Sequence, residues 1–402
     1  MYPISLIRGL MTVTLLSFCF SLAQAQEAFL PVIFKSEGSQ ISFTVRKELL
    51  PVISHIGLNV FTPDFKLVHE QIGSADQALA WEVKEMSRYT EGDTYLYVGA
   101  VTLKPVKGDV YVLPGQIMQL GKKLEFRLMK ERPSNIPGFA PVEFYKSLTE
   151  VAPNNGAAWF FYGVSVCEQS GTGFSADHLM PPPPPAAPPP PGKFVVTEIP
   201  VSKEEQSRID EEDRKWKAQV AALQKDLKIA QPAFLKAAEL AVDCQIKDAA
   251  TAYLAAIATE FDDTELQKQW LLKRIESTCA TNSAKAESYY ALGVKQWECA
   301  YELTGKYANK KAADPFHFRA ITNPAEKQKF DNCVTTAIQY FEKALEADPK
   351  FIGAFFYKSL VYREKQKVTA NLAERKRLND EAAKLNAQGV ALTKQLESLP
   401  VK

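Results

Sequence analysis

Eleven residues near the middle of the chain read PPPPPAAPPPP, from Pro181 to Pro191, and can continue neither a helix nor a sheet. Proline fixes the backbone φ angle and lacks an amide hydrogen, so this run is expected to form an extended polyproline II rod of about 34 Å. A docking ligand for a proline-reading domain is the alternative. Because basic residues do not flank the run closely on both sides, we favour a spacer over residues 181–192 that separates two independently folding domains.

The first 25 residues have the features of a secretory signal peptide. Arg8 is followed by a mostly apolar run over residues 9–22, and Ala23-Gln24-Ala25 supplies an A-x-A cleavage pattern. A membrane anchor is the alternative, but a span needs about 20 apolar residues and this run is shorter. We therefore expect an extracytoplasmic protein, periplasmic or secreted, that begins near Gln26 and has no transmembrane span.

Composition places few limits on the ligand. The chain has 402 residues, 46% of them hydrophobic, so the segments on either side of the rod can each bury a core. Lys and Arg number 48 against 47 Asp and Glu, a balance that provides no basic field for nucleic acid. The sequence therefore predicts no nucleic-acid partner, and the oligomeric state stays open.

Residues 26–180 have the pattern of an all-β domain. Short runs rich in Val, Ile, Phe and Tyr alternate with turn residues such as Gly92-Asp93 and Lys107-Gly108. Several strands at this spacing predict an antiparallel, immunoglobulin-like sandwich. The predicted strands include Ile41–Val45, Val52–Phe61, Ala78–Val83, Thr94–Leu103, Val110–Leu113 and Leu124–Met129.

The aromatic and β-branched segment Ala157–Cys167 allows two interpretations. Val164, Val166 and the nearby glycines favour a last strand of the sandwich. Trp159, four residues before Gly163, would instead suit the opening of a helix in a helical repeat. We favour the strand.

Residues 193–402 show helical periodicity. Ser202 and Glu205 form a capping box, and an amphipathic helix follows with apolar residues at Ile209, Trp216, Val220, Leu223 and Leu227. The last helix, over about 371–396, repeats Leu378, Leu385 and Leu392 at sevens. A helix that caps the array is favoured over a short coiled coil.

The most specific motif in the chain is Ala337-x3-Phe341-x2-Ala344-x4-Pro349. Small residues let paired helices approach closely, the phenylalanine fills the gap to the next helix, and proline ends the turn. Phe355, Ser359 and Tyr362 then fall where a next helix pair would open. This pattern resembles the tetratricopeptide repeat. Partial matches occur at Ala237, Ala249, Tyr253 and Ala256, and at Tyr289, Leu292 and Gly293.

The resemblance implies an all-α, tetratricopeptide-like domain over residues 193–402, with a plain helical bundle as the alternative. Tyr289 and Phe355 are 66 residues apart, where one repeat has about 34, so an insertion around Thr304–Lys327 and longer helices are expected.

Members of the tetratricopeptide family mostly bind protein segments on a concave helical surface. The resemblance assigns a partner-binding stripe there to Tyr290 and Trp297, with Phe356 and Arg363 in the next repeat. The alternative, weighted equally, is that these side chains pack against the insertion or the last helix.

Removal of the signal leaves an odd number of cysteines. An oxidising compartment permits disulfides, and helices that follow one another pack antiparallel. We expect the pairs Cys244–Cys279 and Cys299–Cys333 with Cys167 free, although the four cysteines allow three pairings.

No catalytic, cofactor or metal motif is recognised. The four histidines lack zinc-site spacing, and neither a nucleophile elbow nor a phosphate loop occurs. We expect a non-catalytic protein-binding or scaffold protein of a bacterial cell envelope. The alternatives are a glycan- or polymer-binding β domain, with Trp81, Tyr95, Tyr97 and Trp159 as stacking residues, and an enzyme with an unfamiliar site.

Overall fold

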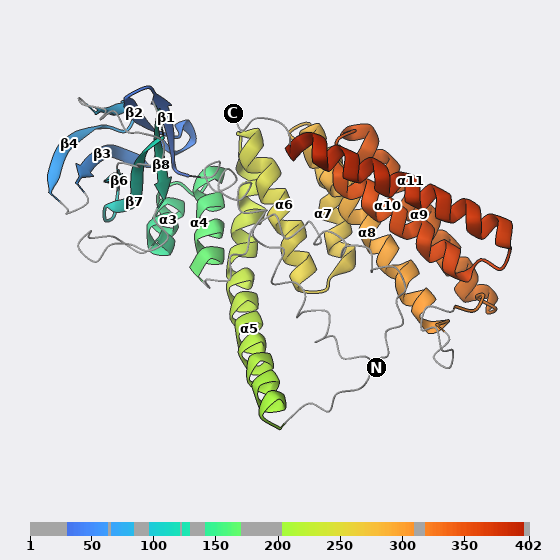
Figure 1. Ribbon diagram of the computed structural model, residues 1–402. Helices are drawn as coiled ribbons and strands as arrows, with labels where there is room; N and C mark the ends of the chain where they lie inside the picture. The colour runs from blue at the N-terminus through green and yellow to red at the C-terminus, as the bar shows by residue number, and fades with distance from the viewer. Residues whose placement is uncertain are drawn as a thin grey trace. The chain divides into compact units, whose positions relative to one another are not determined.

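A computed structural model describes residues 30–62, 66–83, 96–120, 123–128, 141–169, 203–308 and 318–397. The predicted signal peptide and the predicted proline rod lie outside these residues. The chain divides into two compact units (Figure 1). The first contains all the strands and two helices, together with the short segment Glu239–Ile246, and the second contains the remaining helices.

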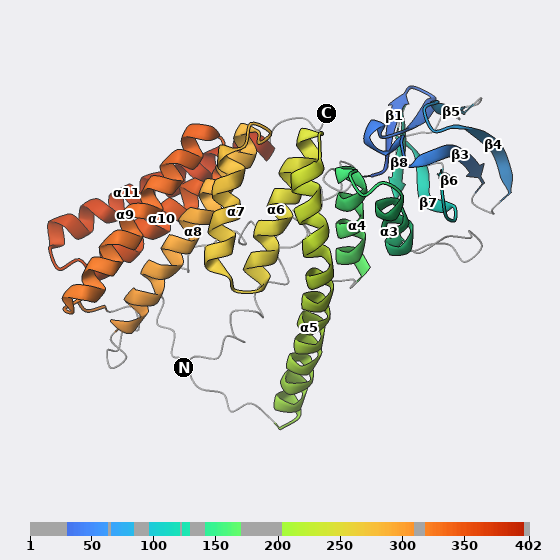
Figure 2. The same ribbon diagram turned by 180° about the vertical axis from the view of Figure 1, so that it is seen from behind.

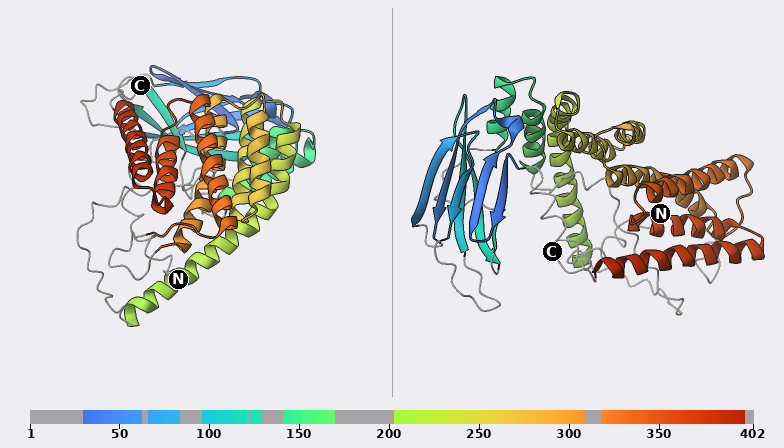
Figure 3. Two further views of the ribbon diagram at one scale, coloured as in Figure 1. Left: turned by 90° about the vertical axis from the view of Figure 1, so that its right-hand side faces the viewer. Right: turned by 90° about the horizontal axis from the view of Figure 1, so that it is seen from above.

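The first unit contains two antiparallel sheets. One sheet has the strand order β1-β2-β5 and the other the order β4-β3-β6-β7-β8, and the right-hand view of Figure 3 shows them as two layers. The strands are β1 (Val32–Glu37), β2 (Gln40–Val45), β3 (Ile53–Phe61), β4 (Leu67–Ser74), β5 (Leu79–Glu82), β6 (Leu96–Pro105), β7 (Tyr111–Leu120) and β8 (Lys123–Leu128). A short 3-10 helix, η1 (Lys47–Leu49), precedes β3.

The strand order is that of an immunoglobulin-like sandwich, as predicted. If β1 to β7 are compared with strands A, B, C, C′, E, F and G, the two sheets have the orders A-B-E and C′-C-F-G. β8 is an additional strand beside β7. The core lies between the sheets, where Phe43 of β2 meets Phe126 of β8 edge to face, with ring centroids 5.0 Å apart.

Two helices follow the strands, α3 (Pro141–Val151) and α4 (Gly156–Gln169), so the predicted strand over residues 157–167 is wrong. Asn155 explains the helix, because its side chain accepts a hydrogen bond from the amide of Ala158 and caps the first turn. Phe161 of α4 then stacks on Tyr145 of α3 at 5.5 Å. This packing outweighs the strand propensity of the valines.

The second unit is all-α, as predicted. Its helices are α5 (Lys203–Leu240), α6 (Cys244–Glu260), α7 (Thr264–Glu276), α8 (Asn282–Lys306), α9 (Pro324–Ala347), α10 (Ile352–Val368) and α11 (Leu372–Glu397). Phe234 of α5 stacks on Tyr253 of α6, with ring centroids 4.4 Å apart. Polar side chains cap several helix starts, among them Asp263 before α7, Thr281 before α8 and Asn323 before α9.

The packing of α8 to α11 is tetratricopeptide-like. α8 packs along α9, α11 packs along α10, and α10 also contacts both α8 and α9 (Figure 2). A helix that packs against both members of the preceding pair is what lets such pairs stack. Phe341 of α9 is fully buried against Gly293 of α8, which places two of the predicted motif positions in contact.

The structure describes the expected insertion only in part. The helix α8 is 25 residues long and ends at Lys306, α9 begins at Pro324, and residues 309–317 between them lie outside the described residues. The two partial motif matches are not consecutive, however. One falls on α5 and α6 and the other on α8, and α7 lies between them as an unmatched helix.

Gly293 provides a test of the α8–α9 packing. A Cβ atom there would lie 2.6 Å from the Phe341 ring, so Gly293→Ala is expected to lower the free energy of unfolding by about 1–3 kcal/mol. This is the opposite of the gain of roughly 1 kcal/mol that alanine usually brings within a helix. Chemical denaturation followed by circular dichroism measures the change.

The matched control is Gly305→Ala, because an added Cβ at Gly305, in the same helix, meets nothing within 4 Å. We expect this variant to be as stable as the parent or more stable. Equal effects of the two substitutions would contradict the close approach of α9 at Gly293.

Candidate functional site

The four residues predicted to bind a partner do not form one open surface. Tyr290 is 3% exposed, and its ring lies among those of Phe341, Phe351 and Tyr357 at 6.0, 5.1 and 5.4 Å. Burial and the neighbouring phenol of Tyr357 raise the pKa of Tyr290, and burial raises that of Tyr357 to about 12. Tyr290 is therefore a neutral core residue and is not accessible to a partner.

Trp297 is half-buried at the junction of α8 and α10. Its ring meets Tyr357 edge to face at 5.2 Å and lies 5.4 Å from Tyr301. Its indole Nε1 is buried and makes no hydrogen bond. Trp297 therefore contributes to the packing between α8 and α10, and truncation of its side chain would leave a cavity beside Tyr357.

Phe356 and Arg363 lie on α10, each half-buried. The Phe356 ring approaches Gly389 of α11, where an added Cβ would lie 3.0 Å from it. Arg363 makes no ion pair or side-chain hydrogen bond within the described part of the chain. Phe356 therefore packs against the last helix, as the alternative expected. The described ring contacts of Tyr290 and Trp297 to other helices are with α9 and α10.

A polar cluster that sequence reasoning missed joins the C-terminal ends of α8 and α10. Glu364 is 3% exposed and accepts hydrogen bonds from Thr304 (2.6 Å) and from Lys367 (2.6 Å). The Lys367 ammonium also lies 5.6 Å from the Tyr301 ring and 5.0 Å from the Phe318 ring. Tyr301 is 50% exposed, so this cluster holds an accessible aromatic ring beside a fixed cation.

A second missed group is a buried ion-pair network that joins three successive helices. Arg274 of α7 binds Asp248 of α6 through two hydrogen bonds of 2.9 and 2.8 Å, and Glu287 of α8 at 3.1 Å. Burial opposes the charge of Arg274, but the hydrogen bonds and charges of Asp248 and Glu287 outweigh it and raise the guanidinium pKa. The network fixes the register of α6, α7 and α8.

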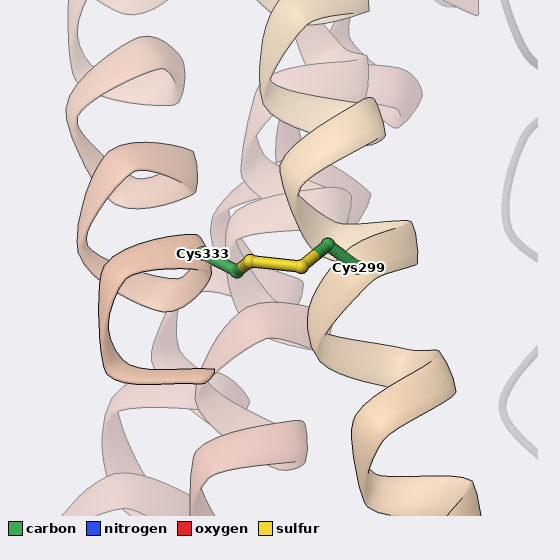
Figure 4. The surroundings of a disulfide bond; sticks show 2 residues. All are labelled: Cys299 and Cys333. Atoms are coloured by element: carbon green, nitrogen blue, oxygen red, sulfur yellow. A yellow bond between two sulfur atoms is a disulfide. The ribbon is translucent and has the colours of Figure 1, made fainter. Parts of the chain in front are cut away.

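Cys299 of α8 and Cys333 of α9 form a disulfide, with Cα atoms 6.1 Å apart (Figure 4). Cys244 and Cys279 are also disulfide-bonded, and Cys167 carries a buried thiol. The partners of Cys244 and Cys279 stay a prediction. The Cys299–Cys333 bridge joins the C-terminal half of α8 to the N-terminal half of α9.

The aromatic residues considered for glycan stacking do not form a strip. Trp81 is 9% exposed and packs edge to face on Tyr97 at 4.7 Å. Trp159 lies on α4, where its indole donates a hydrogen bond to the carbonyl of Pro153. Tyr95 lies outside the described residues.

Within the described ranges, no three His, Cys, Asp or Glu side chains gather as a metal site, and no helix has the length and apolar character to cross a membrane. No protein-family model and no curated protein sequence matches the chain.

Solved structures that resemble the chain include forms of IFIT1. A monomeric mutant with Gppp-AAAA has a TM-score of 0.30 at 13% identity, over 62% of this chain and 45% of that chain. The human IFIT1 dimer with m7Gppp-AAAA has a TM-score of 0.26 at 13% identity, over 62% of this chain and 54% of that chain. The chain thus spans about half the length of these proteins. Similarity this distant identifies neither a fold nor a ligand for the chain.

The Arg274 network makes a prediction about stability. Arg274→Met removes the charge that balances Asp248 and Glu287, and it should lower the free energy of unfolding by about 2–4 kcal/mol. The surface substitution Lys327→Ala breaks an exposed pair with Asp331 and should cost less than about 1 kcal/mol. Denaturant titration of both variants tests this; equal losses would show that Arg274 contributes no more than a surface pair.

The Cys299–Cys333 bridge makes a second prediction. It closes a sequence separation of 34 residues, so the double variant Cys299→Ser, Cys333→Ser should be less stable by about 3–4 kcal/mol. Reduction removes the bridge from the parent as well. The difference between the two proteins, measured by thermal unfolding, should therefore vanish in reductant, and a difference that persists would indicate a packing effect of the serines.

Proposed function

We propose that the protein is an exported, non-catalytic interaction protein of a cell envelope that binds a segment of another protein through its helical unit. The observation that carries this proposal is the stacking of the pairs α8–α9 and α10–α11, in which α10 packs on both helices of the preceding pair. Stacked helix pairs provide extended surfaces that suit peptide segments.

The C-terminal ends of α8 and α10 are the surface that best fits this role. Tyr301 is half exposed there, beside the ammonium of Lys367. Arg363 precedes Lys367 by four residues, so the two cations lie on one face of α10. Aromatic rings and arginine are the side chains that most often dominate interface energies, and Arg363, which has no ion pair with a described residue, suits a carboxylate of the partner.

The disulfides support an extracytoplasmic location. The Cys299–Cys333 bridge and the bonded state of Cys244 and Cys279 require an oxidising compartment to form and persist. We therefore place the mature protein in the periplasm or outside the cell, after removal of the signal peptide.

A substitution at Tyr301 tests the proposed surface. The full chain, immobilised and exposed to solubilised native envelope, should retain specific proteins, and the double variant Tyr301→Ala, Arg363→Ala should retain at least about tenfold less of them. Quantitative mass spectrometry measures the retained proteins. Both side chains are partly exposed, so the thermal unfolding temperature should change little.

The control variant is Val390→Ala on α11, whose side chain is 40% exposed and follows Gly389, which approaches Phe356 near the start of α10, at the other end of that helix from Arg363 and Lys367. It should retain as much as the parent protein. Equal retention by all three proteins would exclude the Tyr301 surface, and the absence of any specific retention by the parent would contradict the proposed binding role.

A further inference from the structure

The N-terminal half of α5 is a helix whose surface is almost entirely exposed. Between Glu205 and Ala222, every residue is exposed except Ile209 and Val220, which are half-buried. The helix buries side chains only from Leu223 onward, and Leu227 is fully buried. A helix of this length gains little stability from helix propensity alone and usually depends on a packed apolar face.

An apolar stripe nevertheless continues through the exposed half. Ile209, Trp216 and Val220 precede Leu223 and Leu227 at intervals of seven, four, three and four residues. This is the spacing of a heptad seam in which Asp213 occupies the position between Ile209 and Trp216. Trp216 is 49% exposed, so the seam that is buried in the second half of α5 remains accessible in the first half.

The charges around this seam are divided into two blocks. Asp210-Glu211-Glu212-Asp213 is acidic, and Arg214-Lys215-Trp216-Lys217 directly after it is basic. Ion pairs within the helix join the blocks, such as Glu211–Arg214 at 2.9 Å and Asp213–Lys217 at 2.6 Å. Exposed pairs of this kind contribute little, so the same charges can also attract an opposing helix.

We propose that this half of α5 pairs antiparallel with the same half of α5 in a second copy of the protein. A parallel pair would set acidic block against acidic block, whereas an antiparallel pair sets each acidic block against a basic block. With a twofold axis between Arg214 and Lys215, Ile209 packs against Val220 of the second copy, and Asp210 lies beside its Lys217. The same surface is used by both copies, as in most homodimers.

The contact spans about two heptads in each copy, which predicts weak and reversible association. This inference does not depend on the proposed partner-binding function, because it concerns a different helix.

Sedimentation equilibrium of the full chain tests the pairing. The average mass should rise from monomer toward dimer between about 5 and about 500 µM protein, and less so at high salt, because salt screens the charge blocks. Ile209→Ser with Val220→Ser should reduce the association constant about tenfold or more, with little change in stability because both side chains are partly exposed. A mass that stays monomeric throughout overturns the proposal.

Charge reversal tests the orientation. A basic variant, Asp210→Lys with Glu212→Lys, and an acidic variant, Lys215→Glu with Lys217→Glu, should each fail to self-associate. A mixture of the two should associate at least as strongly as the parent, because their blocks are complementary. Circular dichroism of each variant and of the mixture shows whether α5 remains helical.

The matched control is Lys376→Glu with Lys384→Glu, which makes the same charge change as the acidic variant at exposed positions of α11. It should self-associate like the parent. Loss of association in this control would mean that net charge, and not the α5 blocks, governs the behaviour. A mixture of the basic and acidic variants that remains monomeric would also contradict the antiparallel pairing.

Discussion

The helical unit depends on one contact, the Phe341 ring against the backbone of α8 at Gly293. Because glycine has no side chain, α9 can approach α8 closely along its whole length. The aromatic rings of Tyr290 and Tyr357 then fill the space beside Phe341, and through them α10 packs on the pair. The same approach brings Cys299 and Cys333 within bonding range. A larger residue at Gly293 would disturb each of these in turn.

The elements that were predictable from the sequence have strong local patterns. β2, β3 and β6 alternate apolar and small or polar residues, and α9 carries both a motif and a capping asparagine. The strands β1 and β4, which are not among those named from the sequence, each lie at the edge of a sheet. In β4, Leu67, Val68 and Ile72 are exposed among polar residues, so it lacks the inward-facing pattern of a buried strand. α4 was mispredicted because the Asn155 cap and the packing on α3 outweigh the valines.

The candidate site was less predictable, because its residues come together only through tertiary packing. Thr304 and Glu364 are 60 residues apart, and Arg274 is 26 residues from Asp248. Neither spacing is a motif, and a buried carboxylate looks like any surface carboxylate in a sequence. The predicted partner-binding stripe stays a prediction. Its member Tyr290 is only 3% exposed, because α10 and its Tyr357 cover that face of α8.

The distribution of charge in the second unit follows from how each helix is covered. The helix α8, which is packed by α7, α9 and α10, carries six charged residues among 25, and the buried charges of neighbouring helices are paired internally, as in the Arg274 network and at Glu364. Such groups are costly to leave unpaired and therefore hold one arrangement of the helices. Where a helix is exposed, as in the first half of α5, charges are denser and form ion pairs within the helix. Because these charges are exposed, they can exchange partners at low cost. The buried Arg274 cannot. The buried networks thus fix the geometry of the packed helices, whereas the exposed half of α5 is suited to association. A substitution in the exposed half of α5 should leave the packing around Arg274 intact, and a substitution at Arg274 should leave the charges of α5 intact.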